Sequence, residues 1–205
     1  MDKFELQSWL QELLEAGELD RAVLELEEKL LELSNSPFQE ILRLKFTNSP
    51  QAIADVIDRF IERESDRFKV EAVYTETNGF AYNPNCWWFS FFAYQKYGGL
   101  EDHDWLSGWN SLDRDDELLQ LTGMESLQRI YQNLMDGEFD SPAEKSGALW
   151  DEARVLCTLL VVCRFQLLIR EAAQHCLRLS VPLLATGHGY DFIAEFRPDP
   201  GHEKP

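Results

Sequence analysis

The sequence predicts an α+β fold that is mainly α: a helical hairpin, a long central helix and a small antiparallel sheet inserted between helices. Three observations predict this class. Apolar residues recur at helical spacing over 3–33 and again after Ser141-Pro142. Alternating and aromatic residues, which favour strands, fill the stretch 68–112. Turn signals such as Asn78-Gly79 separate these segments.

The chain has 205 residues, of which 44% are hydrophobic and 27% charged, as in ordinary globular proteins. We therefore expect a single globular domain over residues 1–197, followed by a disordered tail over 198–205. Its expected parts are helices over 1–67, aromatic-rich strands over 68–112, helices over 113–180 and a last strand over 187–197.

Helix boundaries are marked by a repeated dipeptide. Ser36-Pro37, Ser49-Pro50 and Ser141-Pro142 each place a capping residue before a first-turn proline. The last of these helices should run to about Arg178, with an uncharged stretch over 155–163 that must be surrounded by protein. Polar residues interrupt its apolar stretch before the roughly 20 residues that a membrane span needs, so we expect no membrane segment.

Strands are expected in the middle and at the end of the chain. Apolar and polar residues alternate over 68–75, and aromatic residues dominate 87–97. The stretch 105–111 is a further candidate for a short strand, and 189–196 is the candidate for the last one. The chain provides too few copies of its helical hairpin for a repeat array.

The charge is strongly acidic, with 37 acidic and 19 basic residues and a net charge of −18. This balance excludes a nucleic-acid binder, which needs basic residues to neutralise phosphates. Residues 1–33 hold ten acids and three bases, and residues 98–140 hold eleven acids and two bases. The acids form either a solvated face that favours solubility or a surface that attracts a basic protein.

Four of the six tryptophans fall between positions 87 and 109, next to the acidic run Glu101-Asp102-His103-Asp104. They are Trp87, Trp88, Trp105 and Trp109. The aromatic segment 80–109 is either a core or an exposed surface. Aromatic anchors ringed by acids are typical of a hot spot for a basic protein, and the same pairing suits a cationic ligand.

The residue patterns contain no catalytic motif of high specificity. The two acidic runs, 101–104 and 113–117, lack the glycine and terminal glutamate of a calcium loop, so no metal and no cofactor are predicted. One enzymatic alternative is a thiol hydrolase with Cys86 as nucleophile, His188 as base and Asp191 as its orienting group. This Cys–His–Asp order resembles that of papain-like and transglutaminase-like hydrolases, although those families place the thiol at a helix N-terminus and Cys86 precedes a strand.

We therefore expect a non-enzymatic, acidic binding protein. Four cysteines without a close-spaced pair and an acidic N-terminus indicate a cytoplasmic location. Small acidic chains of this kind are typical of bacterial immunity proteins and antitoxins, which neutralise a basic toxin domain by occluding its active site. A helical scaffold that docks a partner helix on 1–33 is a further alternative. The expected partner-binding residues are Glu101, Asp102, Asp104, Trp105, Trp109, Asp113, Asp115, Asp116 and Glu117.

Overall fold

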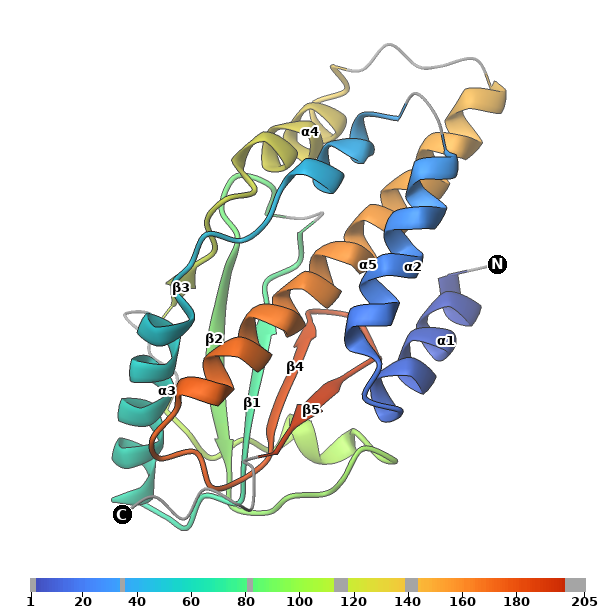
Figure 1. The fold of residues 1–205 in the computed structure, drawn as a ribbon. Coiled ribbons are helices and arrows are strands. Elements are labelled where there is room, and N and C mark those ends of the chain that lie inside the picture. Colours follow the sequence, from blue (N-terminus) through green and yellow to red (C-terminus); the bar gives the residue numbers. More distant parts are fainter. Residues whose placement is uncertain (1–2, 34–35, 81–82, 113–117, 139–143, 198–205) are drawn as a thin grey trace.

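A five-stranded sheet forms the centre of the fold (Figure 1). The computed structural model describes residues 3–33, 36–80, 83–112, 118–138 and 144–197. The strand order is β3-β2-β1-β4-β5. The strands are β1 (Ala72–Thr77), β2 (Trp88–Tyr94), β3 (Leu119–Gln120), β4 (Leu183–Gly187) and β5 (Ala194–Phe196).

The sheet is mixed, so the prediction of an antiparallel sheet is only partly right. β1 pairs with β4 in parallel, with Val73 opposite Leu183, whereas the other three pairings are antiparallel. Parallel strands need a long crossover connection. A chain segment that includes the long helix α5 (Glu144–His175) makes this connection, and a sequence pattern does not reveal which strands it will bring together.

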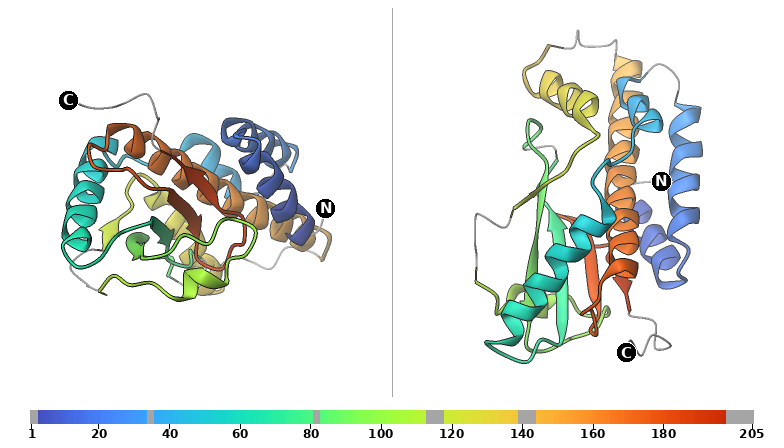
Figure 2. Two further views of the ribbon diagram at one scale, coloured as in Figure 1. Left: turned by 90° about the horizontal axis from the view of Figure 1, so that it is seen from below. Right: turned by 60° about the vertical axis from the view of Figure 1, so that its left-hand side comes forward.

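Helices cover one face of the sheet (Figure 2). They are α1 (Lys3–Glu15), α2 (Leu19–Glu32), α3 (Pro50–Ser65) and α5, while α4 (Glu125–Met135) and the 3-10 helix η1 (Pro37–Arg43) lie beyond one end of the sheet. The Ser-Pro starts act as expected at two positions. The Ser36 hydroxyl accepts a hydrogen bond from the N–H of Phe38, and the Ser49 hydroxyl accepts one from Ala52. Ser141-Pro142 lies outside the described residues.

The central part of α5 is enclosed by protein, as its lack of charge predicts. Leu156, Leu160 and Cys163 are at most 3% exposed, and the helix packs against α2, α3 and β4. Leu167, farther along the helix, is half-buried. The Gln166 amide nitrogen donates a hydrogen bond to the carbonyl of Ala185 at 3.0 Å, which ties α5 to β4. Of the helices in the described residues, none is long and apolar enough to cross a membrane.

The sheet has two differently covered faces. Side chains alternate along each strand, so Val73, Phe89, Phe91 and Ala93 point to the helices and join the main core. The outer face, directed away from the helices, is formed by Tyr74, Glu76, Trp88, Ser90, Phe92 and Tyr94. The segment 97–111 crosses this outer face (Figure 2). The strand expected over 105–111 is wrong, because the chain there forms the 3-10 helix η2 (Asp104–Ser107).

Candidate functional site

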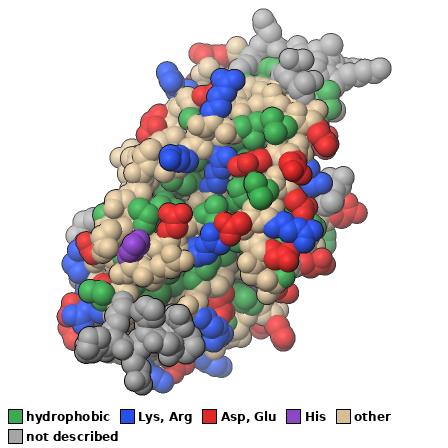
Figure 3. Space-filling model, in the orientation of Figure 1, with side chains coloured by type: hydrophobic (Ala, Val, Ile, Leu, Met, Phe, Trp, Pro, Cys, Tyr) green, Lys and Arg blue, Asp and Glu red, His purple; other side chains and the backbone are tan. Residues whose placement is uncertain are grey.

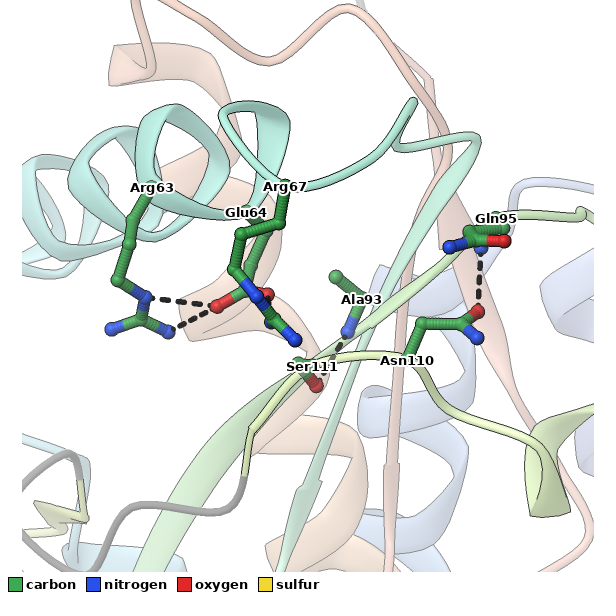
Figure 4. Close-up of polar contacts among 7 residues, drawn as sticks. All are labelled: Arg63, Glu64, Arg67, Ala93, Gln95, Asn110 and Ser111. Carbon is green, nitrogen blue, oxygen red and sulfur yellow. Dashed lines mark hydrogen bonds and ion pairs between the residues drawn. The ribbon is translucent and has the colours of Figure 1, made fainter.

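The segment 97–111 is hydrogen-bonded to the edge of β2 beyond its short pairing with β3 (Figure 4). The N–H of Ala93 donates to the Ser111 hydroxyl at 3.1 Å, and the N–H of Gln95 donates to the Asn110 side-chain oxygen at 2.8 Å. The N–H of Asn110 returns a bond to the carbonyl of Ala93 at 2.8 Å. These contacts satisfy backbone groups that an edge strand would otherwise offer to another strand.

A buried acid lies on α3 next to this edge (Figure 4). The Glu64 side chain is 0% exposed and forms ion pairs with Arg63, at 2.7 Å, and with Arg67. A buried carboxylate needs this pairing because its desolvation is costly. Both of its oxygens are already bound by guanidinium groups, so we assign Glu64 a structural role.

Trp105, one of the expected anchors, packs against a small second core on the outer face of the sheet. Its ring makes edge contacts with Tyr94 and Tyr97, at centroid distances of 4.8 and 5.5 Å. Its indole N–H donates to the carbonyl of Gly99 at 3.0 Å, and the Tyr94 hydroxyl donates to the carbonyl of Leu106 at 2.9 Å. Trp105 therefore holds the segment 97–111 against the sheet and offers only part of its surface to a partner.

Trp109, the second expected anchor, is 44% exposed. Its ring packs edge-on against Phe92 of the outer face at a centroid distance of 5.5 Å. Phe92 in turn contacts Tyr74 at 5.9 Å. A continuous path of aromatic rings thus runs from Trp109 over the outer face.

The acids of this segment are available to a partner. Glu101, Asp102 and Asp104 are exposed, and none of them pairs with a Lys or Arg in the part of the chain that the structure describes. One Asp102 oxygen accepts a hydrogen bond from the N–H of Asp104 at 2.9 Å, which forms a local turn at the start of η2. The other predicted acids, Asp113, Asp115, Asp116 and Glu117, lie outside the described residues.

The helical side carries its charge differently. Figure 3 shows Lys and Arg side chains interspersed with acids on this side of the molecule. Arg21 pairs with Glu18 and Glu25 on α2, and Arg170 of α5 pairs with Asp20 at 2.6 Å. The acidic excess of the hairpin is therefore partly compensated within the fold, in contrast to that of residues 101–104.

Glu76 is a site residue that the sequence analysis missed. It lies on the outer face with its side chain 28% exposed. One carboxylate oxygen accepts a hydrogen bond from the Tyr74 hydroxyl at 2.8 Å, and the other lies 3.3 Å from Nδ1 of His188. Burial first, and Glu76 second, raise the pKa of both Tyr74 and Tyr94 well above the usual range. The alternation of β1, continued from Ala72 and Tyr74, was the available signal for this position.

The three residues of the thiol alternative lie at one end of the sheet. Cys86 is exposed, and its carbonyl accepts a hydrogen bond from the Asn78 side chain, just beyond β1. The N–H of His188 donates to the carbonyl of Thr77, on the β4 side of the same strand end. Two strand spacings amount to about 10 Å, so β1 separates the thiol from the imidazole. The carboxylate beside His188 is that of Glu76, whereas the N–H of Asp191 donates a hydrogen bond to the side-chain oxygen of Gln7.

Within the described residues, no group of three or more His, Cys, Asp or Glu side chains lies together as a metal site would require. The acidic run 101–104 thus shows no ligand cage there. No family model, no curated protein and no solved structure matches this chain. The case for a function therefore depends on the outer face and on the segment that crosses it.

Proposed function

We propose that this protein binds a basic protein through the surface formed by Glu101, Asp102, Asp104, Trp109 and the exposed part of the outer face. The observation that carries the proposal is one segment on the face opposite the helices, which presents an exposed tryptophan together with exposed carboxylates that pair with no Lys or Arg among the described residues. Tryptophan is enriched among the residues that dominate binding energy, and acids around it favour a basic partner.

The proposed mechanism is occlusion. The acidic segment approaches a positively charged active-site cleft of the partner, and Trp109 enters it as the anchor. A basic toxin domain that acts on an anionic substrate has such a cleft. We therefore assign this protein the role of neutralising a toxin, in the cytoplasm. The long-range field of the acids steers the encounter, whereas the tryptophan slows dissociation.

Site-specific photocrosslinking in the native host tests this proposal. A photoreactive phenylalanine analogue replaces Trp109 in one variant and Leu24 in the control. Leu24 is 59% exposed on α2 of the helical hairpin. We expect a basic protein to crosslink at position 109 and not at 24, and the purified chain to inhibit that protein's activity at a one-to-one ratio. Crosslinks at position 24 alone would support the helical scaffold instead, and an acidic protein at 109 would contradict the proposal.

The thiol hydrolase remains a second candidate, because the exposed thiol of Cys86 and the exposed imidazole of His188 lie at the same end of the sheet. In this version His188, oriented by Glu76 or Asp191, would activate Cys86. It requires the loop before β2 to move toward β4. The dependence of Cys86 reactivity on His188 distinguishes the two functions.

A further inference from the structure

We propose that the outer face holds a binding position for a guanidinium group, centred on the carboxylate of Glu76. This inference rests on the proposed function, because it names the part of the basic partner that the face receives. The occupant is an arginine side chain of that partner.

The carboxylate of Glu76 has unused bonding capacity. A carboxylate offers about four acceptor positions. The Tyr74 hydroxyl occupies one of them, and Nδ1 of His188 lies near another at 3.3 Å. Among the described residues, His188 is the only basic side chain paired with Glu76. The carboxylate is thus partly desolvated, 28% exposed and still open to a donor from outside.

Small and aromatic side chains surround the Glu76 carboxylate on the outer face. The strand neighbours directly opposite Glu76 are Ser90 on β2 and Thr186 on β4. Ser90 is small and half-buried, so no bulky side chain of β2 stands directly opposite the carboxylate. Next to Ser90 along the same face of β2 are two half-buried rings, Trp88 and Phe92. A flat cationic group bound to Glu76 would therefore lie among aromatic rings.

The position at Glu76 favours a guanidinium group over an ammonium group. A guanidinium group is planar, binds a carboxylate through two parallel N–H bonds and stacks on aromatic rings. An ammonium group is more strongly hydrated and gains less from a flat aromatic surface. The ring contact between Phe92 and Trp109 also links this position to the segment that carries the acids of 101–104. One partner surface can reach both.

The probe for a test is a hexa-arginine peptide, with hexa-lysine and hexa-citrulline as controls of the same length. Citrulline keeps the shape of arginine without its charge. Glu76→Gln is compared with Glu28→Gln, which makes the same charge change at an exposed site on α2. The readouts are the dissociation constant and the indole N–H signals of the tryptophans in NMR spectra, where Trp88 and Trp109 report on the outer face and Trp9 on the helical side.

We expect hexa-arginine to bind more tightly than hexa-lysine, to shift the Trp88 and Trp109 signals, and to lose about tenfold in affinity with Glu76→Gln. Glu28→Gln should have little effect, and hexa-citrulline should not bind. If Asp102→Asn with Asp104→Asn weakens binding but Glu76→Gln does not, the guanidinium position is wrong while the proposed function stands. Equal affinity for hexa-lysine also overturns it. Equal loss from Glu76→Gln and Glu28→Gln, with no response of Trp109, contradicts both.

Discussion

Gly98 lies directly beneath the ring of Trp105. A Cβ atom added to Gly98 would be 2.3 Å from Cδ1 of the indole, far inside van der Waals contact. The ring cannot move aside easily, because Tyr94 and Tyr97 pack against it. This close approach keeps the segment 97–111 against the sheet and determines where the acids of 101–104 are presented.

Gly98→Ala should therefore destabilise the protein by about 1–3 kcal/mol, the usual cost of overpacking. Gly108→Ala is the matched control, since a Cβ there would meet only the Trp105 carbonyl at an ordinary 3.6 Å. Urea unfolding, followed by tryptophan fluorescence, measures both variants. Equal stability of the two would show that the ring is not held in place.

Leu160→Ala should lower the free energy of unfolding by about 2–5 kcal/mol, because the side chain is fully buried in α5 and leaves a cavity. Leu149→Ala, on the same helix but 48% exposed, should change it by less than about 1 kcal/mol. Chemical denaturation measures the free energy of unfolding of both variants. A small effect at position 160 would mean that α5 is peripheral to the core.

The two tryptophans of the candidate surface should separate stability from binding. Trp109→Ala should leave the unfolding free energy nearly unchanged and weaken binding of the captured partner by about 2 kcal/mol, as for a hot-spot residue. Trp105→Ala should reduce stability instead, because it removes a ring that packs against Tyr94 and Tyr97 beside the small core of the outer face. Calorimetric titration and thermal unfolding of both variants provide the comparison. The assignment of Trp109 as anchor fails if its removal affects stability more than binding.

Association should be steered by the acids of residues 98–140. Exposed charges more than about 10 Å apart are largely screened at 0.1 M salt, so the association rate should fall with salt while the dissociation rate changes less. A fourfold variant with asparagine at Asp102, Asp104, Asp115 and Asp116 should associate more slowly. The charge-matched control carries glutamine at Glu12, Glu15, Glu28 and Glu32. Surface plasmon resonance with the captured partner measures the association and dissociation rates. Identical rates for the two variants would mean that the acids of 98–140 contribute only to solubility.

Cys86 should react with iodoacetamide faster than the other three cysteines simply because they are buried. Burial raises the pKa of the Cys157 thiol to about 12, which leaves almost no thiolate at neutral pH. Fast labelling of Cys86 alone is thus no evidence for a nucleophile. If the protein only binds, His188→Ala should leave the labelling rate of Cys86 unchanged. A rate that falls several-fold in this variant, read by mass spectrometry, would favour the thiol hydrolase.

Stability should fall as the pH rises above about 10. The pKa of Tyr74 and that of Tyr94 are raised by burial and by Glu76, so the folded chain keeps phenolic protons that the unfolded chain releases. Their stabilising effect is complete below about pH 10 and is lost as the pH climbs toward the folded-state values. Tyr74→Phe should therefore show a shallower decline of the unfolding free energy, measured by urea unfolding, between about pH 9.5 and pH 11.5. Parallel curves for the two proteins would contradict this.

The position of Glu76 shows why part of the candidate surface escaped the sequence. Alternation along β1 puts Glu76 on the same face as Tyr74, but only the pairing of β1 with β4 brings His188 beside it. His188 is 112 residues away along the chain, and local patterns contain no information on such pairing. Trp105 and Trp109 look alike in the sequence, and only the fit of one ring over Gly98 separates them.

The sequence by itself determined the α-helical segments, because capping serines, prolines and apolar spacing act over a few residues. It also determined the acidic excess of 98–140 and the uncharged stretch that had to become the buried part of α5. The tertiary structure decided the rest: that β1 and β4 run parallel, that the aromatic strand β2 is packed on both faces, and that the segment 97–111 covers the outer one. These features depend on contacts between distant residues, and those contacts arise only when the long crossover through α5 returns the chain to the sheet.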